Sequence, residues 1–152
     1  MENVAMQPVK IIGLKIRTSN DSGKADIDIP ALWNKFMGKS IAERIPNRID
    51  DEIVAVYTNY ESDYTKPYDM IIGCRVGMLD TIPEGMVGRS FDAGNFTKFT
   101  AKGDLTKDAV INTWMQIWKT PLERSYLADF EVYGEKAQNP YDGEAEIFVG
   151  VK

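Results

Sequence analysis

The sequence of 152 residues contains no histidine. This absence excludes Ser-His-Asp triads, Cys-His nucleophile pairs, His-ligated zinc and an imidazole pH switch built from this chain alone. Catalysis would therefore depend on carboxylates, tyrosines, lysines or a bound cofactor. We identify no catalytic residue, no metal site and no cofactor site in the sequence, and we expect a protein that is not an enzyme.

Cysteine and long apolar runs are also scarce. The one cysteine, Cys74, cannot form an internal disulfide, which fits a reducing compartment. No segment approaches the roughly 20 apolar residues of a membrane helix, and the N-terminus lacks the pattern of a signal peptide. We therefore expect a soluble, cytoplasmic protein without a membrane partner.

Basic residues are outnumbered, with 18 Lys and Arg against 23 Asp and Glu and a net charge of -5. Because affinity for a phosphate backbone depends on clustered positive charge, this balance disfavours direct binding to nucleic acid. A chain of this length suits one domain, and it buries roughly 70% of the surface that its unfolded form exposes. We expect a single domain over residues 1–152.

Apolar residues recur at helical spacing in two stretches. The first begins at Pro30, a favoured first residue of a helix, and ends near Gly38. The second covers about residues 106–119, with Thr106 or Asp104 as its N-cap. These patterns predict two helices.

Six runs rich in β-branched and aromatic residues are bounded by Gly, Pro, Asn or Asp, which predicts strands. They cover residues 9–17, 53–60, 70–76, 88–101, 129–133 and 145–151. The order is strand, helix, strand, strand, and then the same order again. We therefore expect an α+β fold.

The two halves also share residues in register, which indicates an internal repeat. The matches are Trp33 with Trp114, Val56-Tyr57 with Val132-Tyr133, and Pro67-Tyr68-Asp69 with Pro140-Tyr141-Asp142. We predict a duplicated strand-helix-strand-strand unit, with repeats at about residues 5–77 and 86–152.

Glu131 interrupts an apolar segment. Side chains alternate along a strand, so Glu131 shares one face with Tyr133, and Phe130 shares the other with Val132. A buried carboxylate without a partner costs several kcal/mol, so it must be paired, protonated or awaiting a cation. Exposure of Glu131 on an edge strand is the alternative. The repeat places Ala55 at the position of Glu131, which would make a pocket with one acidic wall.

Aromatic side chains make up 11% of the chain, and the repeat would bring six of them together. These are Trp33, Tyr57, Trp114, Trp118, Tyr126 and Tyr133. Aromatic faces beside a carboxylate suit an organic cation, because each cation–π contact contributes about 0.5 to 2 kcal/mol. A simple role in the core is the alternative. It is favoured for Trp118 and stays open for Trp33 and Trp114.

The segment Phe130-Glu131-Val132-Tyr133, the Trp-containing helix in each half and the final strand together resemble a known family. It is the effector-binding domain of bacterial multidrug-sensing regulators, the gyrase-inhibitor-like superfamily, in its stand-alone integron-cassette form. The resemblance implies an antiparallel sheet with helices that flank a cleft for lipophilic, often cationic, aromatic compounds. By its position in the family motif, Glu131 would recognise the charge and Tyr133 would be a neighbouring wall. The internal repeat, and not the motif, adds Tyr57, Trp33 and Trp114 as walls, and we also expect Tyr126 in the ligand site.

The resemblance thus implies a ligand-binding protein for small lipophilic cations. Regulators of this family carry a helix-turn-helix module, and Met1 lies just before the first expected strand, so we expect no direct contact with DNA. Two alternatives remain. Glu131 could act as the base of a histidine-free hydrolase of strained electrophiles, with Tyr57 or Tyr133 as donor. The fold could also inhibit a protein partner or form a homodimer.

Overall fold

The computed structural model describes residues 2–152, with the backbone alone at Ser22. None of the described helices is both long and apolar enough to cross a lipid bilayer. The strands and α-helices are β1 (Glu2–Met6), β2 (Val9–Thr18), α1 (Lys24–Gly38), β3 (Ile53–Thr58), β4 (Tyr68–Val76), β5 (Val87–Phe91), β6 (Gly94–Gly103), α2 (Ala109–Lys119), β7 (Arg124–Tyr133) and β8 (Gly143–Val151). Four short 3-10 turns lie at Asp21–Gly23, Ile41–Arg44, Glu135–Ala137 and Pro140–Asp142.

The strands form one antiparallel sheet in the order β1-β6-β8-β7-β3-β4-β2-β5. Exchange of β1–β4 with β5–β8 gives the same order in reverse, so the two halves of the chain have the same topology. Each half contributes its first strand to the far edge of the other half, since β1 pairs with β6 and β5 pairs with β2. The predicted α+β class with an antiparallel sheet is confirmed.

The symmetry of the sheet is centred on the ladder between β3 and β7. Ala55 lies opposite Glu131 in this ladder, and the flanking pairs are Ile53 with Tyr133 and Tyr57 with Asp129. The sequence repeat matches Ala55 with Glu131, so these two equivalent residues meet at the middle of the sheet. The fold therefore places this acidic difference between the halves at the centre of the sheet.

Two strand predictions need correction. The run 88–101 is not one strand, because Asp92 and Ala93 interrupt it and separate β5 from β6. Asp is disfavoured in strands and common in turns, which explains the break. Strand β1, which no sequence pattern predicted, pairs with β6, where Val4 lies opposite Phe96.

Helix α1 begins at Lys24, six residues before the predicted start at Pro30. Pro30 therefore lies inside the helix, where it removes one backbone hydrogen bond. Leu32 and Phe36 after the proline belong to the hydrophobic core on the sheet, and Ile29 before it packs against the same core. This packing stabilises the helix across a residue that usually starts or ends one.

Helix α2 begins at Ala109, not near Thr106, and neither predicted cap is used. The Asp104 carboxylate instead accepts the backbone N–H of Thr106 at 2.9 Å. This bond closes a local turn of the kind that Asp side chains favour, so residues 104–108 lead into the helix without belonging to it.

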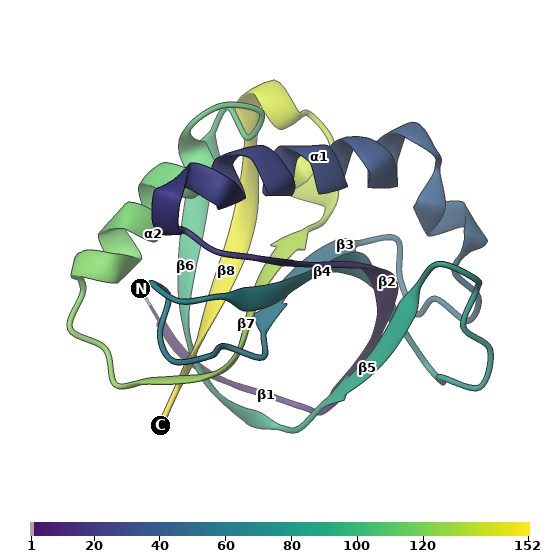
Figure 1. The fold of residues 1–152 in the computed structure, drawn as a ribbon, viewed down its shortest axis with the longest axis horizontal. Coiled ribbons are helices and arrows are strands. Elements are labelled where there is room, and N and C mark those ends of the chain that lie inside the picture. The colour runs from purple at the N-terminus through teal and green to yellow at the C-terminus, as the bar shows by residue number, and fades with distance from the viewer. Residues whose placement is uncertain (1) are drawn as a thin grey trace.

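The sheet buries both of its faces. Figure 1 shows α1 and α2 on one side of the sheet and the edge strands β1 and β5 on the other. On the helix side, Leu32, Phe36 and Ile117 pack on the strands. On the other side the sheet curls, so that Phe91 of the edge strand β5 contacts Phe130 of the central strand β7, with ring centroids 5.4 Å apart.

Strands β2 and β4 approach each other closely at Gly13 and Gly73, which are partners in the ladder. A Cβ atom added to Gly13 would lie 2.1 Å from the carbonyl oxygen of Ile72, and one added to Gly73 would lie 2.1 Å from that of Ile12. Only glycine fits at these two positions.

Candidate functional site

A large cleft of about 1260 Å³ lies between the two helices and the sheet. Its wall takes residues from α1, α2, β3, β4 and β7. Five of the six predicted site residues line it, namely Trp33, Tyr57, Trp114, Glu131 and Tyr133. The symmetric topology thus brings residues from both halves of the chain into one space.

Glu131 lies at the base of this cleft with 1% of its surface exposed, so the alternative that it points to water is wrong. Its neighbours Phe130 and Val132 belong to the core on the other face, as the alternation predicts. Three neutral groups donate hydrogen bonds to the carboxylate. They are the Tyr57 hydroxyl (2.7 Å to Oε2), the Trp114 indole Nε1 (2.7 Å to Oε2) and the Tyr133 hydroxyl (2.6 Å to Oε1).

No positive side chain neutralises Glu131, which takes part in none of the ion pairs formed by residues 2–152. Burial raises the pKa of its carboxyl, and the three hydrogen bonds lower it but do not cancel the effect of burial. Burial and the nearby carboxylate raise the pKa of Tyr57 and of Tyr133 well above the usual value, so both remain donors. Glu131 is therefore a buried carboxylate that accepts hydrogen bonds from neutral groups alone.

Two tryptophans shape the cleft around this carboxylate. Trp33 on α1 packs edge-on against Tyr133, with centroids 5.0 Å apart. Trp114 on α2 packs edge-on against Tyr57 at 5.5 Å. Both line the cleft, but Trp114 also belongs to the hydrophobic core and Trp33 packs against it, so contact of either ring with a ligand stays a prediction. Trp118 packs against the core and also lines the cleft.

Tyr126 differs from its prediction, because it is not among the residues that line the cleft. Its backbone has a φ of 55°, in the left-handed region that few non-glycine residues adopt. This conformation directs the ring to Arg124, whose guanidinium carbon lies 4.4 Å from the ring centroid, and to Tyr60 at 5.5 Å.

Sequence reasoning missed Arg124, which also lines the cleft. Strand β7 bulges after this residue, since Arg124 pairs with Val151 whereas Asp129, five positions on, pairs with Val149. The bulge brings Nη2 of Arg124 within 2.7 Å of Oδ2 of Asp129. Asp129 is fully buried and also accepts hydrogen bonds from the Tyr60 hydroxyl and the Gly150 N–H. Of the two acids on this face of β7, Asp129 has an internal cation and Glu131 has none.

Three further tyrosines of the cleft wall were missed. Tyr60 and Tyr64 come from the loop between β3 and β4, and Tyr68 begins β4. The ring of Tyr64 stacks on Trp118, with centroids 5.1 Å apart and an interplanar angle of 7°. The density of tyrosine between residues 57 and 68 was the available signal, but an irregular loop has no periodicity that predicts where its rings point.

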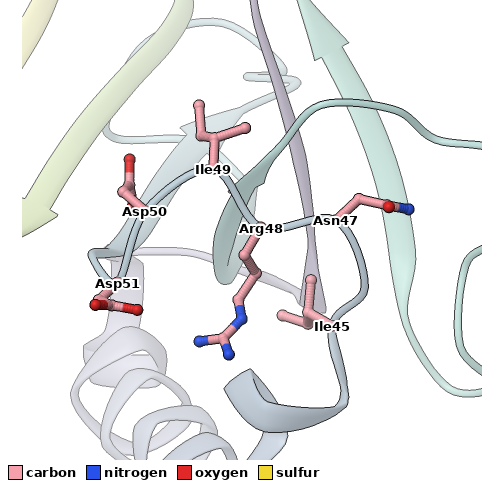
Figure 2. Close-up of a pocket in the computed structure, with 6 residues that line it drawn as sticks. All are labelled: Ile45, Asn47, Arg48, Ile49, Asp50 and Asp51. Atoms are coloured by element: carbon pink, nitrogen blue, oxygen red, sulfur yellow. The ribbon is translucent and has the colours of Figure 1, made fainter.

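A second hollow of about 520 Å³ lies along the loop 45–51. Figure 2 shows that the side chains of Arg48, Asp50 and Asp51 point in different directions there. Because a binding site needs polar groups that converge on one ligand, the large cleft is the candidate site.

The sequence pattern of the Cass2 family, described as integron-associated effector binding proteins, matches residues 4–151. The chain belongs to this family. A Bacillus subtilis (strain 168) relative, the candidate transcriptional regulator YobU, is 27% identical over 147 residues, which cover 94% of this chain and 92% of YobU. The predicted resemblance to effector-binding proteins is confirmed.

Two solved structures extend the comparison. The Vibrio cholerae integron cassette protein VCH_CASS2 is 26% identical, with a TM-score of 0.78 over 99% of this chain and 95% of that protein. SAV2435, solved with bound tetraphenylphosphonium, is 14% identical, with a TM-score of 0.80 over 99% of this chain and 93% of SAV2435. This Cass2-family chain therefore has the fold of both proteins.

Proposed function

We propose that the protein binds lipophilic organic cations in the cleft and does no chemistry on them. Glu131 recognises the positive charge, and Trp33, Tyr57, Trp114 and Tyr133 enclose the aromatic body of the ligand. The observation that carries this proposal is a fully buried carboxylate that only neutral donors contact.

The energetics favour a cation as the missing partner. Removing a carboxylate from water costs several kcal/mol, and hydrogen bonds from neutral groups offset part of that cost. A cation in the cleft adds Coulomb attraction where water is excluded, and each aromatic face contributes about 0.5 to 2 kcal/mol more. A neutral ligand would leave the charge of Glu131 without compensation.

The bound tetraphenylphosphonium of SAV2435 supports the same ligand class. It is a lipophilic cation without hydrogen-bond donors, so it would be recognised by charge and aromatic contact alone. The net charge of -5 also favours cationic small molecules over nucleic acid as direct ligands. A protein partner or a second copy of the chain stays a prediction.

Titration with tetraphenylphosphonium, followed by the fluorescence of the three tryptophans, all of which line the cleft, tests the proposal. We expect saturable binding to the parent and binding at least about tenfold weaker to Glu131→Gln, which keeps the shape of the side chain and removes the charge. Glu61→Gln, on the exposed loop, is the matched control and should bind as the parent does. Equal affinity of the parent and Glu131→Gln would exclude charge recognition by this residue.

Hydrolysis is the alternative chemistry for a buried carboxylate beside tyrosine hydroxyls. Multiple turnover of an epoxide by the parent, abolished in Glu131→Gln, would replace binding by catalysis as the function of the cleft. We expect no turnover.

A further inference from the structure

Arg124 is a second polar element in the wall of the cleft, separate from Glu131. Only 6% of its side chain is exposed, and its Nη2 is bound to Asp129 at 2.7 Å. The other two guanidinium nitrogens, Nε and Nη1, are buried without a hydrogen-bond partner within residues 2–152. The guanidinium thus has its charge compensated and part of its hydrogen-bonding capacity unused.

Unpaired buried donors are uncommon in native proteins, and each one calls for a physical explanation. The explanation must supply an oxygen or another acceptor close to Nε or Nη1. A trapped water and a bound ligand are two sources, and Arg124 lies in the wall of the cleft, where a ligand that displaces a neighbouring ring would reach it.

Three rings surround the guanidinium. Tyr126, which does not line the cleft, lies 4.4 Å from the guanidinium carbon. Trp114 and Tyr64, which do line it, lie at 5.9 and 6.0 Å. Tyr64 belongs to the irregular loop between β3 and β4 and is only half-buried. Rotation of this ring would open the path from the cleft to Arg124.

We propose that Arg124 is a second recognition point of the cleft, which donates its free N–H groups to an oxygen acceptor on the ligand. The inference rests on the proposed function, because it assumes that Glu131 binds the cationic part of the same molecule. Arg124 and Glu131 then act on opposite features of one ligand, its oxygen and its positive charge.

The acceptor is a neutral oxygen, such as that of an ester, amide or ether. Asp129 already compensates the charge of Arg124, and Glu131 adds a second negative charge to the same strand face. An anionic group would therefore meet net repulsion, whereas a neutral acceptor needs only the two free donors. The favoured ligand is a lipophilic aromatic cation that also carries a carbonyl or ether oxygen.

Two dyes with the same cation isolate this contact. Tetramethylrosamine and tetramethylrhodamine methyl ester share one xanthylium cation and differ in a methyl ester on the pendant ring. We expect the parent protein to bind the ester about tenfold more tightly, as expected of a hydrogen bond from a charged donor. The corresponding free acid, which carries a carboxylate in place of the ester, should bind more weakly than the ester.

The variant Arg124→Lys assigns the preference to this residue. Lysine keeps a positive charge beside Asp129 but lacks the planar fork of donors. The ratio of the two dissociation constants, taken within one variant, should fall from about ten to near one. Arg17→Lys makes the same change beside Asp69, on the other face of the sheet, and should keep the ratio of the parent.

The outcomes separate the inference from the proposed function. Binding of both dyes to the parent with equal affinity means that water satisfies Arg124, and it overturns the inference alone. Retention of the ester preference in Arg124→Lys also overturns it. If neither dye binds the parent, the proposed function fails and the inference fails with it. If Arg124→Lys does not fold, two measurements on the parent test the inference. They are the ratio of the dissociation constants of the two dyes and the weaker binding of the free acid.

Discussion

Ala55 and Glu131 face each other across the central ladder of the sheet, and both are buried. They occupy equivalent positions in the two halves of the chain, yet one is a methyl group and the other a carboxylate. The small side chain of Ala55 leaves room beside Glu131, and it adds no second charge. The cleft thus offers a ligand a carboxylate at the centre of the sheet that the other half of the chain does not repeat.

Replacement of Glu131 by Gln should stabilise the unliganded protein at neutral pH. Burial raises the pKa of this carboxyl in the folded state. Between the pKa of the unfolded chain and that of the folded protein, the folded protein therefore retains a proton that the unfolded chain has released. The contribution of the protonated Glu131 to the free energy of unfolding is therefore present at low pH, and it is lost as the pH rises through the pKa of the folded state. We expect Glu131→Gln to gain about 1 kcal/mol at pH 7.5 in urea denaturation, and to gain little at pH 4.

Glu61→Gln, in the exposed loop, serves as the control and should not change stability at either pH. An equal gain for Glu131→Gln at both pH values would mean that packing, not ionisation, explains it.

The variant Tyr57→Phe should move ligand binding to higher pH. The Tyr57 hydroxyl donates to Glu131 and lowers the pKa of its carboxyl, so its loss raises that pKa. Because recognition of a permanently charged cation requires the ionised form of Glu131, ligand binding weakens as the pH falls through the pKa of this carboxyl. Tetraphenylphosphonium affinity on the acid side should drop by about fivefold in the variant. Tyr141→Phe, with 71% of the residue exposed, should leave the pH profile unchanged.

The variant Asp129→Asn should destabilise the fold strongly. Asp129 compensates the buried guanidinium of Arg124, and its loss leaves that charge unpaired. We expect the free energy of unfolding in urea to fall by about 3 to 5 kcal/mol. Breaking the exposed pair of Lys102 and Glu144 by Lys102→Gln should change little. A similarly small effect of Asp129→Asn would mean that water enters and solvates Arg124.

The variant Gly13→Ala should separate β2 from β4. The added Cβ would lie 2.1 Å from the backbone oxygen of Ile72, which cannot rotate away as a side chain can. We expect a loss of about 3 kcal/mol or more by thermal unfolding. Gly38→Ala, at the end of α1, places its Cβ where no atom lies within 4 Å, and it should keep or slightly raise the stability. A Gly13→Ala protein as stable as the parent would mean that the two strands can move apart without loss.

Strand alternation is a local property, so the sequence predicted which side chains of β7 share a face, but it left open whether the face of Glu131 is buried or exposed. Glu131 and Tyr133 point to the cleft, and Phe130 and Val132 to the opposite core, as the period of two requires. Helical spacing placed Trp33 and Trp114 on helices for the same reason. Patterns of this kind need only a few neighbouring residues.

The features that were missed depend on contacts far apart in the chain. Strand β1 has no strong local preference and forms because β6, over 80 residues away, offers an edge. The position of Arg124 depends on the bulge in β7, and the sequence of residues 125–128 does not predict that bulge. Pro30 marks a helix start by its local preference, and only packing against the sheet carries α1 past it.

The exchange of first strands between the halves determines when the protein can fold during synthesis. Glu2 pairs with Lys98, and Tyr57 pairs with Asp129, so the first strand and the inner edge of the N-terminal half have their partners in the second half of the sequence. Until β6 and β7 have been synthesised, β1 has no partner and β3 has an open edge. The sheet therefore closes, and the walls of the cleft meet, only after these strands have left the ribosome.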